Sequence, residues 1–123
     1  MGRDMKKTKK DDLQTFKDFC DFWIIALSLT DWDYRIVGKS TTKDNANVLL
    51  NPEGRKAYIS LSKKREPNIT VEQLAIHEVD EMLLADIAFL LHRYYSDDLI
   101  EEEIHKVINR LMPIQLVFKN KKA

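Results

Sequence analysis

Cysteine, glycine and proline are all scarce in this chain: its 123 residues include one cysteine, three glycines and three prolines. The single cysteine, Cys20, excludes an intramolecular disulfide and a zinc site made of several cysteines. One lone cysteine also agrees with a reducing, intracellular setting. The low content of glycine and proline argues against an internal linker, so we expect one soluble domain over residues 1–123. The cytoplasm is the default location.

The chain also lacks a long apolar run and an excess of charge. The apolar stretch FCDFWIIALSL contains an acid and is too short to cross a bilayer, so we interpret it as part of a core helix and expect no membrane role. The net charge is zero but uneven: residues 1–10 carry five basic groups, whereas residues 66–103 carry eleven acids and one base. This acidic centre argues against nucleic acid as a partner and favours a cation site between basic tails.

The spacing of apolar residues in the first half of the chain predicts one helix and three strands. Helical spacing extends from Asp12 to about Ser28. Alternation from Trp32 to Ile36 predicts a strand, and residues 47–50 and 56–61 flank the turn NPEGR as a hairpin.

The second half of the chain is predicted to be helical. A helix should begin at Val71, capped by Thr70 and Gln73, and run to about Tyr95. A further helix is predicted over residues 99–111, where Pro113 should stop it, and IQLVF after it suits a short strand or an ordered tail. The element order indicates an α+β fold.

The segment AIHEVDEMLLAD, residues 75–86, places a histidine and four acids in an apolar helix. Buried charge is costly unless it is paired or bound to a metal. At helical spacing His77 and Glu81 share one side, Glu78 lies at its edge, and the apolar residues lie behind. His77 and Glu81 are therefore candidate metal ligands.

HEVDE differs by one residue from HExxH, the motif of zinc peptidases. In HExxH, two ligands one turn apart hold the metal, which lowers the pKa of its bound water, and the intervening glutamate accepts the proton. By position, His77 is the first ligand, Glu78 is the general base, and Glu81 replaces the second histidine.

A third ligand is expected from the following helix. Its helical angle favours Glu101, with Glu103 next. His92 and His105 are interpreted as surface histidines or as histidines with structural partners. The alternative for the whole pattern is a solvated acidic face, because HExxE alone is a weak motif and a run of glutamates suits the first turn of a helix.

The order of these parts resembles the minigluzincins, small single-domain zinc peptidases, and more closely the HExxH-like proteins common in bacteriophage genomes. The resemblance covers about residues 29–111, from the DW strand and the hairpin ANVLL…RKAYISL to AIHEVDEMLLAD and EEEIHKVINRL. It implies a short three-stranded sheet packed on a long active-site helix, then a helix that supplies a glutamate ligand from Glu101 to Glu103. It also implies a peptide or protein substrate, and a host cytoplasm if the protein is phage-encoded.

Glu81 changes what such a site could do. One histidine and two glutamates around a divalent ion form a neutral shell, whereas two histidines and one glutamate leave a charge of +1. A neutral shell should acidify water less and favour Mn²⁺ or Fe²⁺ over Zn²⁺. Two hypotheses follow: a metal-dependent hydrolase with Glu78 as base, or a catalytically inactive, metallopeptidase-like phage accessory or binding protein.

Overall fold

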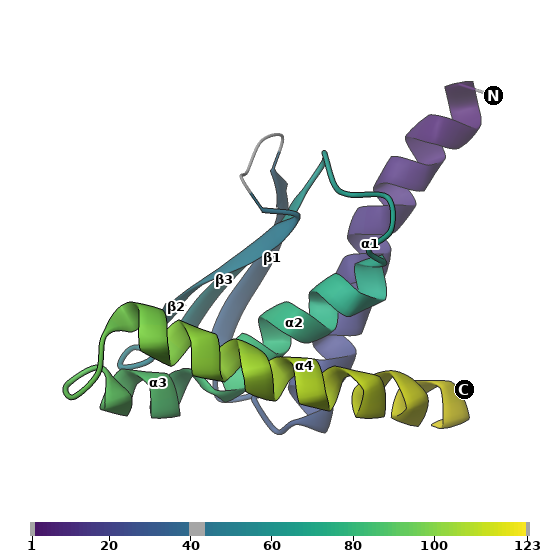
Figure 1. The fold of residues 1–123 in the computed structure, drawn as a ribbon. Helices are drawn as coiled ribbons and strands as arrows, with labels where there is room; N and C mark the ends of the chain where they lie inside the picture. Colours follow the sequence, from purple (N-terminus) through teal and green to yellow (C-terminus); the bar gives the residue numbers. More distant parts are fainter. Residues whose placement is uncertain (1, 40–43, 123) are drawn as a thin grey trace.

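The computed structural model describes residues 2–39 and 44–122, and its fold is α+β, as predicted. Figure 1 shows three strands beside crossing helices, with the two termini at the ends of long helices. The elements in order are α1 (Gly2–Ala26), β1 (Asp33–Lys39), β2 (Ala46–Asn51), β3 (Lys56–Ser62), α2 (Val71–Leu83), α3 (Ala85–Leu91) and α4 (Asp97–Lys122).

The sheet has the strand order β1-β3-β2, so β3 lies in the centre and β2 at an edge. The predicted hairpin is confirmed, because β2 pairs antiparallel with β3, with Val48 opposite Ile59. β1 is parallel to β3, with Ile36 opposite Ile59. Ile59 and its neighbours on the same face of β3, Ala57 and Leu61, are buried, which matches the alternation in the sequence.

The core forms where α1 packs against α2 and the sheet. Phe16, Cys20 and Ile24 recur at four-residue spacing on α1, and all three are fully buried. Ile76 and Val79 of α2 are fully buried in the same cluster. Burial of each such aliphatic side chain contributes about 1.5–3 kcal/mol, so this packing holds α2 firmly in place.

A buried polar contact joins α2 to α4. Gln115 Nε2 donates a hydrogen bond of 2.8 Å to Asp80 Oδ1, and Asp80 is fully buried. The other two oxygens, Asp80 Oδ2 and Gln115 Oε1, are buried without a hydrogen-bond partner in the described residues. Burial raises the pKa of Asp80 to about 6, although the hydrogen bond from Gln115 lowers it in part. The contact therefore fixes α4 on α2 at some cost to stability at neutral pH.

The predicted helix over residues 71–95 is wrong in its length. α2 ends at Leu83, Leu84 adopts φ −94° and ψ 1°, and α3 then runs only to Leu91. The segment 71–95 contains neither glycine nor proline, so no local signal marks this break. α3 lies along the beginning of α4 in Figure 1, and the break is what directs it there.

The prediction that Pro113 ends the last helix is also wrong. α4 continues through Pro113 to Lys122, so residues 114–118 are helical rather than a strand or an irregular tail. A proline inside a helix costs about 3 kcal/mol because it removes a backbone hydrogen bond. Beyond it, the Gln115 contact and the packing of Leu116 on the core offset that cost.

The first helix is longer than predicted: α1 begins at Gly2 rather than near Asp12. Over residues 2–39 and 44–122, none of the helices combines the length and the apolar character that a bilayer crossing requires.

The buried carboxyl group of Asp80 generates a pH-dependent stability prediction. Its pKa is raised from 3.8 when unfolded to about 6 when folded, so its favourable contribution is complete below pH 3.8 and is lost as pH rises through 6. Asp80→Asn has no charge to bury, and its amide can donate to Gln115 Oε1. The free energy of unfolding of the variant, relative to that of the native chain, should therefore increase by about 2 kcal/mol as pH is raised from 4.5 to 7.5.

This difference is measured by urea unfolding of both proteins in EDTA at the two pH values. Leu49→Ala, at a position that is 61% exposed and carries no titratable group, is the control and should change stability equally at the two pH values. An equal stability difference at pH 4.5 and 7.5 would contradict the assignment to Asp80.

Candidate metal centre

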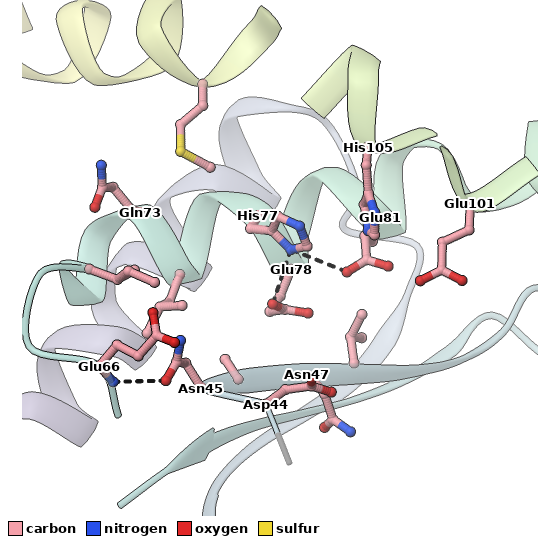
Figure 2. Close-up of a pocket in the computed structure, with 15 residues that line it drawn as sticks. Asp44, Asn45, Asn47, Glu66, Gln73, His77, Glu78, Glu81, Glu101 and His105 are labelled. Carbon is pink, nitrogen blue, oxygen red and sulfur yellow. Dashed lines mark hydrogen bonds and ion pairs between the residues drawn. The ribbon is translucent and has the colours of Figure 1, made fainter. Parts of the chain in front are cut away.

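Three side chains from two helices converge beside the sheet. His77 and Glu81 come from α2 and His105 comes from α4, and each offers one ligand atom within 4.8 Å of the other two. All three residues are half-buried, so they are shielded yet accessible. Figure 2 shows His105 descending from α4 toward Glu81, next to His77.

The position of His77 follows from the start of α2. Thr70 and Gln73 form the predicted capping box: Thr70 Oγ1 accepts from the Gln73 backbone N–H, and the Gln73 side chain accepts from the Thr70 N–H. This cap fixes the first turn at Val71. The helical phase then directs His77 and Glu81 to the same side, one turn apart.

His77 is held between two carboxylates. Its Nδ1 atom lies 3.2 Å from Glu78 Oε2 and 3.3 Å from Glu81 Oε2, as the dashed lines in Figure 2 mark. The hydrogen bonds to Glu78 and then Glu81 raise the pKa of His77 to about 10, although burial opposes this. In the metal-free protein, a proton on His77 therefore supplies the positive charge that the two carboxylates require.

Glu78 is the most enclosed acid of the group, with a side chain only 4% exposed. Burial raises the pKa of Glu78 to about 7, and the neighbouring His77 opposes this rise. A carboxyl group whose pKa lies near neutrality can both accept and return a proton at working pH. In the metal-free protein, burial therefore brings the pKa of Glu78 into the range in which a carboxyl group exchanges protons near neutral pH.

These residues open into a cavity of about 700 Å³ between α2, α4 and the edge strand β2. The strand contributes Ala46, Asn47 and Val48 to the wall, and in Figure 2 it runs across from the labelled His77 and Glu78. Five acids line the cavity: Asp44, Glu66, Glu78, Glu81 and Glu101. No lysine or arginine is among the described residues that line it. A concave surface with one sign of charge concentrates cations.

The two predicted ligands of α4 occupy different places. Glu101 lines the cavity but lies outside the group of three ligand atoms. Glu103 is exposed, does not line the cavity, and binds Lys106 Nζ at 3.0 Å. The two positions are about 200° apart around the helix, so they cannot face the same site.

His105 is the residue that the sequence reasoning missed. It was expected to be a surface histidine or one with a structural partner, but its ring centroid lies 5.2 Å from that of His77. A signal was present in the sequence. His105 follows Glu101 by four residues, so any packing that directs Glu101 toward α2 also brings His105 there.

The three donors fit a divalent cation. Two imidazoles and one carboxylate are a common donor set for zinc in hydrolytic enzymes. Tetrahedral zinc at about 2.0–2.2 Å from each ligand separates its ligands by about 3.3–3.6 Å. Closing from 4.8 Å needs side-chain movements of about 1 Å, which half-buried residues at the edge of a cavity can make.

Comparison with known proteins does not assign the chain to a family. No family model matches the chain, and no curated protein or solved structure matches it significantly. The resemblance to minigluzincins therefore stays a prediction.

The double contact of His77 generates a prediction for the metal-free protein. Because two carboxylates stabilise its protonated form, His77 should remain protonated from pH 6 to pH 8 in EDTA. Imidazole ¹⁵N chemical shifts measured by NMR report this state directly. In Glu78→Gln combined with Glu81→Gln, the pKa of His77 should fall toward its ordinary value of 6.5. A His77 that titrates near 6.5 in the native chain would contradict the arrangement.

Proposed function

We propose that this chain binds a divalent metal ion through His77, Glu81 and His105, and hydrolyses peptide bonds with Glu78 as the general base. The observation that carries the proposal is the convergence of three ligand atoms within 4.8 Å beside a buried glutamate. An ion held there supplies a Lewis acid that polarises a carbonyl group and acidifies water.

His105 as a ligand changes the net charge of the proposed ligand shell that contains Glu81. The expected shell of one histidine and two glutamates would be neutral around a divalent ion. With His105 in place of a second glutamate, the shell has two histidines and one carboxylate and keeps a charge of +1. Relative to the HExxH pattern, α2 has exchanged a histidine for a glutamate and α4 supplies the histidine. The composition favours Zn²⁺, although Mn²⁺ and Fe²⁺ also accept such donors.

Glu78 is proposed as the base because of its burial and its place in the cavity wall. Its carboxyl group lines the same cavity as the three donors and has a pKa raised to about 7 by burial. With an ion in place of the proton on His77, Glu78 would no longer have its hydrogen-bonded partner there. Its oxygen atoms are then available to take a proton from water inside the cavity.

A peptide substrate is supported by the position of β2. This strand pairs only with β3 among the described residues, so its outer edge has backbone groups free for another strand. Residues Ala46–Val48 on this strand line the cavity. An extended peptide that adds to such an edge gains main-chain hydrogen bonds while its backbone passes the metal centre.

Metal binding is tested by thermal unfolding of protein from which ions have been removed with EDTA, before and after Zn²⁺ is added. Zn²⁺ at about 100 times its Kd should stabilise the native chain by about 2.7 kcal/mol, which raises its melting temperature by several degrees. His105→Ala should abolish most of this shift. Glu103→Ala, on the same helix but outside the cavity, is the matched control and should keep it.

A double variant tests whether Zn²⁺ affinity depends on the types of donor present or on which position each donor occupies. Glu81→His combined with His105→Glu keeps two histidines and one glutamate, so it should retain Zn²⁺ affinity within about tenfold. His105→Glu alone should lose more. Zn²⁺ affinity that is equal in the native chain and in His105→Ala would contradict the proposed ligands.

Hydrolysis is tested with casein and a mixed peptide library in the presence of Zn²⁺, Mn²⁺ or Fe²⁺. Glu78→Gln should lower the rate about 10²- to 10⁴-fold while metal binding persists. Glu102→Gln, exposed on α4, should keep the native rate. A native protein that binds the ion tightly but cleaves no peptide would instead support the inactive, binding-protein hypothesis.

A further inference from the structure

A second cavity adjoins the metal centre. It has a volume of about 550 Å³ and lies between α3, the first turns of α4 and the end of the β2–β3 hairpin. Glu81, Glu101 and His105 line both cavities, so the two cavities meet at two of the three proposed ligands, Glu81 and His105. Figure 2 shows these three residues together at one end of the first cavity.

The walls of the second cavity differ in chemistry from those of the first. They are built mainly from aliphatic side chains that are buried or half-buried: Leu50, Leu84, Ala85, Ala88, Ile100 and Ile104. The break at Leu84 makes this wall possible, because it directs α3 alongside α4. Acids lie around this apolar centre, among them Glu53, Asp97 and Glu101.

We propose that this second cavity binds one uncharged apolar side chain of the substrate, branched aliphatic or aromatic, next to the bond that is cleaved. The inference rests on the proposed function, because it identifies the substrate class of that same site. The occupant follows from continuity: a group in the second cavity lies against Glu81 and His105. Aliphatic walls favour an apolar side chain, and the surrounding carboxylates disfavour an acidic one.

The size of the cavity leaves ample room for a branched aliphatic or an aromatic side chain. About 550 Å³ lies in the lower part of the range for small-molecule sites, which is roughly 300–1,000 Å³. Transfer of a leucine side chain from water into such a site is worth about tenfold or more in affinity over glycine.

The first experiment tests the cavity without metal. The protein in EDTA, labelled with ¹³C at alanine methyl groups, is titrated with N-acetyl-leucinamide and followed by NMR. The methyl signals of Ala85 and Ala88 should shift, with a Kd on the order of 1–10 mM, and N-acetyl-glycinamide should leave them unchanged. The absence of any shift at both residues overturns the proposal, whatever the metal data show.

The second experiment tests the connection to the metal centre. N-acetyl-leucine hydroxamate and N-acetyl-glycine hydroxamate are titrated into the Zn²⁺-loaded protein by calorimetry. The leucine compound should bind at least about tenfold more tightly. Equal affinities overturn the proposal. Failure of Zn²⁺ itself to bind overturns the proposed function instead, and the EDTA titration then still reports on the cavity alone.

Variants of α3 test whether the preference for the leucine compound over the glycine compound arises in this cavity. Ala88→Trp fills it and should remove the advantage of the leucine compound without weakening the glycine compound. Ala88→Leu is a smaller change that serves if the tryptophan variant does not fold. Ile87→Trp, at a neighbouring position of the same helix that is 53% exposed and outside the cavity, is the control and should keep the preference. An unchanged preference in both Ala88 variants contradicts the assignment.

Discussion

The hydrogen bond between Gln115 and Asp80 is the contact on which the candidate site depends. It joins the two helices that carry the ligands, and it is buried, where a hydrogen bond is strong and its geometry is strict. Because α4 is one continuous helix, fixing Gln115 also fixes the direction of His105, ten residues earlier. Met112 and Leu116 pack on the core and support the same orientation.

Charge balance explains why an apolar helix carries so many ionisable groups. Glu78 and Glu81 both contact His77, and burial alone would disfavour two charged carboxylates so close together. A proton on His77 supplies the required positive charge in the metal-free protein. A divalent ion would supply more positive charge at the same place. The group is therefore costly to bury empty, and a cation bound there would offset that cost.

Much of the fold could be predicted because it follows from local patterns. Alternation in β1 and in the β2–β3 hairpin, and the capping box at Thr70, all appear as the sequence indicates. The break at Leu84 and the passage of α4 through Pro113 were not predictable in this way. At both places tertiary packing overrides local preference: α3 turns to lie beside α4, and the contacts of Gln115 keep the helix intact beyond the proline.

The sequence by itself determined that His77, Glu78 and Glu81 form one group, because residues one turn apart on a helix are neighbours in any fold that keeps the helix. Only the tertiary structure decided which residue of α4 joins them. Glu101 and His105 share one face of that helix, whereas Glu103 points elsewhere to Lys106. The rotation of α4 about its axis is set by side chains far along the chain, in particular Gln115 against Asp80. No local pattern encodes that rotation, so only the tertiary structure places His105 beside Glu81 and His77.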